Sequence, residues 1–202
     1  MLTNLPPLTR FLIICNVAVF FAQGLLGDVL VTWFGLWPLA GPSFGSYPSF
    51  MPWQLVTYAF LHGGLSHLLF NMFALYMFGG ELESYLGGRR LFNLYFVSVV
   101  SAALMQLLVS SAGDRIPAPT IGASGGVFGL LLAFGLFFPT RTMVLLIPPI
   151  PLPAWLFVTL YGFLELILGV FGSGGGIAHF AHLGGMLGAW LLIHRWMRQR
   201  GL

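Results

Sequence analysis

The sequence predicts an all-α, polytopic membrane protein, and three observations lead to that fold class. Of its 202 residues, 58% are hydrophobic and only 6% are charged, whereas about a quarter of the residues in an ordinary soluble domain are charged. A mean hydropathy of +0.93 leaves too little polar surface to coat a soluble globule of this size. The apolar stretches are long enough for helices of about 20 residues and lack the short alternating pattern of a membrane β-barrel.

Six apolar segments, each bounded by Gly, Pro or charged residues, are predicted to span the bilayer. They cover residues 9–26, 66–84, 91–111, 122–138, 153–171 and 177–197, to within a few residues. The first begins like a signal peptide, but five further spans follow it, so we expect a retained helix. No internal repeat or linker divides the chain, and we expect residues 1–202 to form one membrane domain.

The arginines predict how the segments are oriented. Seven of the eight fall on one side if the segments alternate in direction, and only Arg115 falls on the other. The seven are Arg10, Arg89, Arg90, Arg141, Arg195, Arg198 and Arg200. By the positive-inside rule, both termini are expected in the cytoplasm, and a bacterial inner membrane is expected for a short chain without a targeting extension. Lys is absent and the arginines are scattered, so no nucleic-acid partner is expected.

A long connection between residues 27 and 65 is rich in aromatic side chains. It carries Trp33, Phe34, Trp37, Phe44, Tyr47, Phe50 and Trp53. Aromatic side chains suit the headgroup level of a bilayer. They would either anchor the chain at the interface or form a lateral wall of a substrate access route, and the sequence leaves both interpretations open.

Polar groups within the spans mark the places where chemistry is expected, because such groups are costly in lipid. His67 and Asn71 lie four residues apart in the second span and share one helix face. The run 121–129 places Ser124 among small residues at the start of the fourth span. His182 lies at a comparable depth in the sixth span. A buried hydroxyl beside an imidazole is the minimal pair for covalent catalysis.

Each of these motifs also fits helix packing alone. His67 and Asn71 would form a polar clasp between helices. Gly125 with Gly129, and the pair Gly184 and Gly188, would let another helix approach closely. We expect these two small-residue pairs to bring the fourth and sixth spans into contact.

The catalytic interpretation gives each polar residue a role. Ser124 would attack a carbonyl, and His182 would accept and later return the proton. The side chains of His67 and Asn71 would stabilise the oxyanion together with the Ser124 backbone N–H, aided by the helix dipole. Because no Asp or Glu lies at matching depth in the second, fourth or sixth span, a dyad is expected rather than a triad, with Asp114 as the nearest loop carboxylate.

At these residues the chain resembles the rhomboid family of intramembrane serine proteases. The motifs are Ile121-Gly-Ala-Ser124-Gly, then His62 with His67-Leu-Leu-Phe-Asn71-Met, Gly79 and Glu83 following, and Ala181-His182-Leu-Gly-Gly185, in family order over residues 50–190. The resemblance implies a six-helix bundle that cleaves peptide bonds in or near transmembrane segments of membrane proteins. It implies a Ser-His dyad without a metal or organic cofactor, with transmembrane proteins and the lipid bilayer as partners.

The resemblance also implies individual roles. Ser124 is then the nucleophile, His182 the base, and His67 and Asn71 occupy the oxyanion positions. The supporting positions are His62 as a structural histidine, Glu83 as a tie between the second span and its cytoplasmic neighbours, and Gly125 and Gly185 as close-packing residues.

Two positions depart from what some family members have. Trp53-Gln54 stands where they have Trp-Arg, and Phe128 stands where they have Tyr, so Phe128 can stack on His182 but cannot donate a hydrogen bond.

Two further residues, His179 and Glu165, and two further functions have to be considered. His179 makes an HxxH pair with His182, although a catalytic zinc would require a third ligand. Glu165, a carboxylate in the fifth span, is expected to serve helix packing, with a gating or substrate role as the alternative. The chain could instead be a non-catalytic rhomboid-like binder of membrane proteins, or a small transporter with a proton relay, although inverted repeats are not apparent. No particular oligomeric state is predicted.

Overall fold

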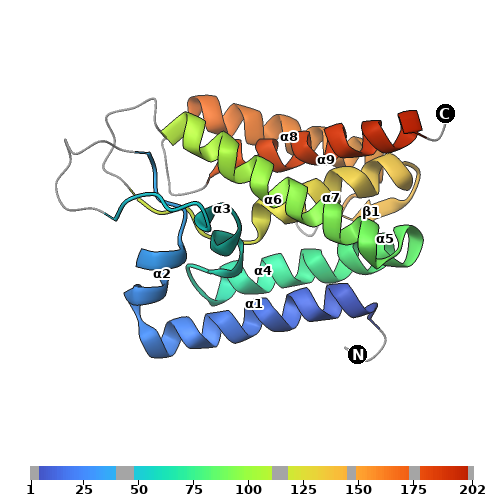
Figure 1. Ribbon diagram of the computed structural model, residues 1–202. Coiled ribbons are helices and arrows are strands. Elements are labelled where there is room, and N and C mark those ends of the chain that lie inside the picture. The colour runs from blue at the N-terminus through green and yellow to red at the C-terminus, as the bar shows by residue number, and fades with distance from the viewer. Residues whose placement is uncertain (1–4, 40–47, 111–117, 145–148, 173–177, 200–202) are drawn as a thin grey trace.

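The computed structural model describes residues 5–39, 48–110, 118–144, 149–172 and 178–199. It is a bundle of helices, so the all-α fold class is confirmed (Figure 1). The longest helices are α1 (Pro7–Leu26), α6 (Gly88–Ser110), α8 (Ala154–Phe171) and α9 (His179–Gln199), with the shorter α7 (Ser124–Phe137) among them. Pro7 stands in the first turn of α1, where its missing N–H costs no hydrogen bond.

The second predicted span is one irregular helix rather than a straight one. It consists of α4 (Leu65–Ala74), a π-helical turn (Leu75–Gly79) and α5 (Gly80–Leu86), and it ends at Gly87, whose φ is +82°. A left-handed conformation of this kind favours Gly because a Cβ would be strained there.

Shorter elements connect the long helices. They are α2 (Asp28–Phe34), α3 (Gln54–Thr57), a 3₁₀ turn (Tyr58–Phe60), and the antiparallel pair of β1 (Thr142–Val144) with β2 (Pro151–Pro153).

Each of the six predicted spans contains a helix, but the number of membrane crossings stays a prediction. Within the described residues, α1, α6 and α8 are long and apolar enough to cross a bilayer by length and composition. With its 14 residues, α7 rises only about 21 Å, less than the roughly 30 Å of the hydrocarbon core.

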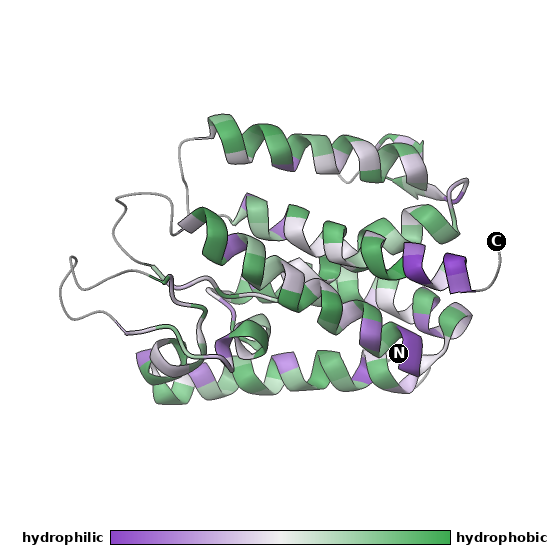
Figure 2. Cartoon of the chain, turned by 45° about the horizontal axis from the view of Figure 1, so that its top comes forward, coloured by the Kyte–Doolittle hydropathy of each residue, from purple (hydrophilic) through white to green (hydrophobic). Residues whose placement is uncertain are grey.

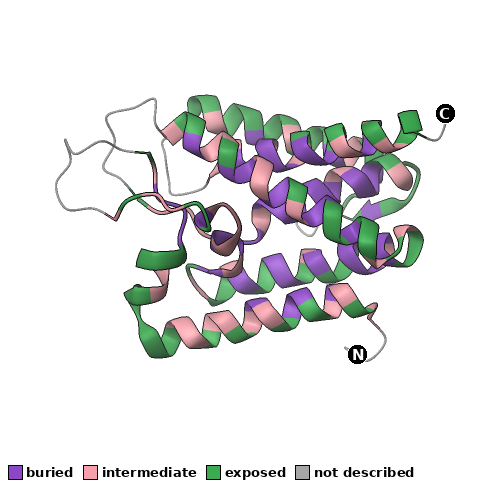
Figure 3. Cartoon of the chain, in the orientation of Figure 1, coloured by how far each residue is buried: buried purple, intermediate pink, exposed green. Residues whose placement is uncertain are grey.

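Helix α7 forms the centre of the bundle, because it packs against α6, α8 and α9. Ten of its 14 residues are buried, and Figure 3 shows buried residues concentrated in this central layer. Small residues permit this packing: a Cβ at Gly126 would lie 2.5 Å from the Tyr95 ring of α6. Ser124, the first residue of α7, lies at the end of this buried helix and is itself partly accessible.

The glycines of α9 face two different helices, which corrects one expectation. A Cβ at Gly185 would overlap the Gly125 carbonyl of α7, so this glycine makes the expected contact between the fourth and sixth spans. Gly184 and Gly188 instead face Met105 and Ser101 of α6. The reason is that residues three or four apart share a face, so only one stripe of α9 can meet α7.

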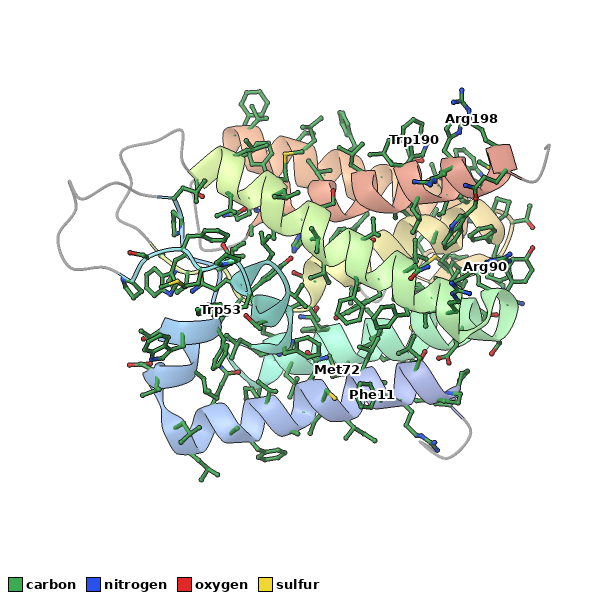
Figure 4. The ribbon with its side chains drawn as sticks, in the orientation of Figure 1. Phe11, Trp53, Met72, Arg90, Trp190 and Arg198 are labelled. Carbon is green, nitrogen blue, oxygen red and sulfur yellow. The ribbon has the colours of Figure 1, made fainter. Side chains whose placement is uncertain are left out.

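The ends of the bundle differ in polarity. Both termini lie at one end (Figure 1), and hydrophilic residues gather there (Figure 2). Arg90 and Arg198 lie at this same end, whereas Trp53 lies toward the other (Figure 4). The helices between the two ends expose apolar side chains such as Phe21, Leu108 and Phe171, as expected where lipid replaces water as the solvent.

Candidate active site

The side chains of Ser124 and His182 meet across the contact between α7 and α9. Ser124 Oγ lies 2.8 Å from His182 Nε2, a hydrogen-bonding distance. The imidazole is buried, with 8% of the residue exposed, whereas Ser124 is partly accessible. Because Ser124 opens α7, its backbone N–H belongs to the first turn, whose amides have no partner within the helix.

Glycines make the approach of the two helices close enough for this contact. A Cβ at Gly125 would lie 2.5 Å from the Ala102 Cβ and 3.1 Å from the Tyr58 hydroxyl. Together with the clash at Gly185, this leaves no room for a larger residue at either position. The small size of Gly185 therefore lets α9 approach α7, whereas the small size of Gly125 lets α7 pack against α6 and Tyr58.

An aromatic stack covers the His182 ring. Phe128 lies parallel to the imidazole, with 4.1 Å between ring centroids and 4° between the planes. Tyr161 of α8 continues the stack on Phe128, at 5.4 Å and 25°. Phe128 thus restricts rotation of the imidazole without donating a hydrogen bond to it.

His67 presents one ring nitrogen to the nucleophile's side of the site. Its Nδ1 accepts a hydrogen bond from the Gly63 backbone N–H at 3.3 Å, so in the neutral ring the proton is on Nε2. The Nε2 end lies against Gly122, where a Cβ would be 2.7 Å from it and 3.8 Å from Ser124 Oγ. Gly122 has φ of +129°, a conformation that an L side chain rarely adopts.

Asn71 is buried one turn beyond His67, and its amide is only partly used. Its Nδ2 donates to the His67 carbonyl at 2.9 Å, which leaves the second N–H of that amide for another acceptor. Among the described residues, no hydrogen bond joins Asn71 or His67 to Ser124. The resting hydroxyl therefore holds neither donor, and of the two it is the His67 ring that the structure places beside Gly122 and Ser124.

A carboxylate does accompany the Ser-His pair, contrary to the sequence-based expectation. Oε2 of Glu165 lies 2.9 Å from His182 Nδ1 and 2.7 Å from His179 Nδ1. The expectation failed because it considered the second, fourth and sixth spans, whereas Glu165 belongs to α8 in the fifth. Asp114, the loop carboxylate considered instead, lies outside the described residues.

Glu165 also provides the third ligand that a zinc site at His179 and His182 would require. The donor atoms of Glu165, His179 and His182 all lie within 4.8 Å of one another. However, the separations of 2.7 and 2.9 Å are hydrogen-bond distances, whereas ligands of a tetrahedral zinc are about 3.3 Å apart for bonds of about 2.0 Å. The set could hold a metal only after moving apart.

The chain matches a known protein family. The Rhomboid domain family matches residues 49–199. This range includes Ser124 and His182 and the helices that carry them, α7 and α9. The chain belongs to the rhomboid family.

Three similar proteins show how far the relationship extends along the chain. This rhomboid is 37% identical over 103 residues to the mitochondrial Rhomboid protein 1 of Saccharomyces cerevisiae, covering 50% of this chain and 30% of that protein. It is 32% identical over 125 residues to Rhomboid protease GlpG of Yersinia pestis strain Pestoides F, covering 62% and 41%. RHOMBOID-like protein 5 of Arabidopsis thaliana is 40% identical over 79 residues, covering 39% and 25%. The matches span less than half the length of each relative.

The structure gives the contacts of two supporting residues of this rhomboid, His62 and Glu83. His62 is buried with its ring 5.1 Å from the His67 ring, and neither of its ring nitrogens has a hydrogen-bond partner in the described part of the chain. Burial lowers the pKa of His62 to about 4. Glu83 accepts hydrogen bonds from the backbone amides of Leu8 and Thr9 and from the Thr9 hydroxyl, at 2.7 to 2.9 Å. It therefore joins α5 to the first turn of α1.

Two residues organise the rhomboid site although neither was assigned a site role from the sequence. Tyr58 is fully buried, donates to the Val99 carbonyl at 2.8 Å, and accepts the Gly122 backbone N–H at 3.0 Å through its own carbonyl. Burial raises the pKa of its hydroxyl. Gln54 Oε1 accepts from the backbone amides of Trp37 and Met51, both at 3.2 Å. In the sequence, Gln54 could have been recognised because it is a polar residue within the aromatic connection.

The aromatic connection divides into exposed and buried parts. Trp33 and Trp53 are about half exposed, whereas Trp37 is buried. Phe44 and Tyr47 lie outside the described residues. The exposed indoles fit an interfacial anchor, and the access-route interpretation stays a prediction.

Proposed function

We propose that this rhomboid is an intramembrane serine endopeptidase that hydrolyses peptide bonds in or near transmembrane segments of membrane proteins. The observation that carries the proposal is the 2.8 Å contact of Ser124 Oγ with His182 Nε2 at the start of a buried helix. A serine hydroxyl is a weak nucleophile until a base accepts its proton. The imidazole is placed to do so, and the GlpG relative is named as a protease.

The proposed reaction proceeds through an acyl-enzyme. His182 Nε2 accepts the proton as Ser124 Oγ attacks the substrate carbonyl, and then gives it to the leaving amine. Water completes the hydrolysis with His182 again as the base. The Ser124 backbone N–H, His67 Nε2–H and the second Asn71 N–H would donate to the oxyanion, and the N-terminus of α7 adds a favourable dipole. The reaction as proposed uses no metal or organic cofactor.

We also propose that residues 1–202 form a single membrane domain with both termini in the cytoplasm of a bacterium. The position of the termini and of Arg90 and Arg198 at one end of the bundle supports this orientation (Figure 4). Fusing alkaline phosphatase and green fluorescent protein to each terminus tests it. Phosphatase activity at either terminus would contradict the proposal.

A serine-directed fluorophosphonate probe tests the proposed function directly. Wild-type protein in liposomes should be labelled and should cleave a single-pass reporter substrate, whereas Ser124→Ala should do neither. The alternative, a non-catalytic rhomboid-like binder, predicts that the reporter co-purifies with the protein intact and that no label is incorporated. Transmembrane proteins are the substrates or ligands in either case.

A further inference from the structure

The buried face of α8 contains an ionisable side chain. Three of the helix's 18 residues are buried, namely Ala154, Val158 and Glu165. A carboxylate in a membrane-spanning helix is costly unless it is paired. Glu165 is only 6% exposed, and within the described residues both side chains at hydrogen-bonding distance from its carboxylate belong to α9. The partners of the buried carboxylate are therefore the imidazoles of His179 and His182.

An ionised Glu165 would select one tautomer of His182. An ionised carboxylate can only accept hydrogen bonds. An ionised Glu165 would receive, at Oε2, the Nδ1–H of His182 over 2.9 Å and the Nδ1–H of His179 over 2.7 Å. With its proton on Nδ1, the neutral His182 ring has an unprotonated Nε2, which is the nitrogen that lies 2.8 Å from Ser124 Oγ. This is the tautomer that a general base requires.

We propose that Glu165 is a positioning residue that holds His182 in the base-competent tautomer and stabilises the imidazolium formed when Ser124 attacks. The inference deepens the proposed function and rests on it: the dyad becomes a Ser124–His182–Glu165 arrangement. His179 contributes the second N–H, which keeps the carboxylate oxygen aimed at His182 Nδ1. Phe128 covers the ring face, so the imidazole is held on its face and at both nitrogens.

Helix packing and gating by α8 are the competing roles for Glu165, and each predicts a different result. A packing role predicts lower thermal stability with normal turnover of the folded protein. A gating role predicts altered cleavage of a transmembrane substrate, while a small probe reacts with Ser124 at the normal rate. Only the positioning role requires that the reactivity of Ser124 itself decreases.

The test compares Glu165→Gln with wild type in liposomes, and Glu83→Gln serves as the matched control. Glu83 is also a buried carboxylate, but it binds the first turn of α1. Three quantities are measured: the rate of fluorophosphonate labelling, kcat and KM for the reporter substrate, and the melting temperature. Glu165→Asp, which keeps the charge, is made alongside in case the amide variant fails to fold.

Loss of the carboxylate in soluble triads costs about 10⁴-fold in kcat. We expect Glu165→Gln to lower kcat and the labelling rate together by about 10²- to 10⁴-fold, with KM unchanged. Glu165→Asp should retain more activity than the amide variant. Glu83→Gln should lower the melting temperature and leave the labelling rate of the folded protein unchanged.

A normal labelling rate in Glu165→Gln, whether cleavage is normal or reduced, would overturn the positioning role. If Glu165→Gln does not fold, a labelling rate in Glu165→Asp equal to that of wild type would overturn it equally, because the side chain is one methylene shorter and the lengthened contact with Nδ1 should lower the rate. Failure of wild-type protein to be labelled would instead refute the proposed function. The two failures are therefore distinguishable.

Discussion

Acidification should destabilise the protein through His62, and the size of the effect follows from its burial. The His62 side chain is buried without a hydrogen-bond partner in the described residues, and burial lowers its pKa from 6.5 to about 4. The unfolded chain therefore binds a proton near pH 6.5, whereas the folded protein resists protonation until about pH 4. Stability is fully present above pH 6.5 and falls as the pH decreases toward 4.

The magnitude can be worked from these two pKa values. Between pH 7.5 and 4.5, the linkage relation gives a loss of about 2 to 3 kcal/mol in the free energy of unfolding from His62 alone. We expect this part of the pH dependence to disappear in His62→Phe, which keeps an aromatic ring next to His67 but cannot be protonated. The uncharged His62→Asn serves as a second variant in case the larger ring does not fit.

Unfolding by SDS in mixed detergent micelles, at pH 7.5 and 4.5, measures the effect. The quantity compared is the pH-induced change in each protein, not the absolute stability, because the substitutions also change packing. His67, whose ring lies 5.1 Å from the His62 ring and also lowers the pKa of His62, keeps the same uncharged neighbour in both variants, so agreement between them identifies the contribution of His62. The reasoning is refuted if wild type, His62→Phe and His62→Asn lose the same free energy of unfolding between the two pH values.

Three further predictions concern the reaction. Ser124→Ala and His182→Ala should each abolish cleavage while the protein stays folded. The double variant should be little worse than either single variant, because members of a catalytic unit fail together. Substantial activity in either single variant would contradict the assignment of Ser124 and His182 as the catalytic pair. Extensive chelation should leave cleavage intact, because the pair needs only proton transfer; loss of activity that zinc restores would assign Glu165, His179 and His182 to a metal instead. Asn71→Ala should lower kcat by up to about 10²- to 10³-fold with little change in KM; a normal kcat per fluorophosphonate-labelled molecule, with a lowered melting temperature, would show that Asn71 is structural.

Hydropathy and local spacing were sufficient for the fold class and for the candidate residues. Each apolar segment contains a helix, because lipid requires every backbone polar group to be satisfied within the segment. Spacing along one helix also predicts which of its own residues share a face, as for His67 and Asn71. The run around Ser124 and the motif around His182 pointed to the rhomboid family for the same local reason, and the family is confirmed.

The tertiary structure decided which helix faces meet. Periodicity along one helix places residues around its own axis, but the neighbour of each face depends on how the helices cross. Gly185 therefore meets α7, while Gly184 and Gly188, on the same short run, meet α6. Glu165 reaches His182 across 17 positions of sequence, and this contact arises only when α8 packs beside α9. Because the energy of a buried carboxylate depends on the groups that surround it, the sequence could mark Glu165 as unusual, but only the packed bundle could supply its partners.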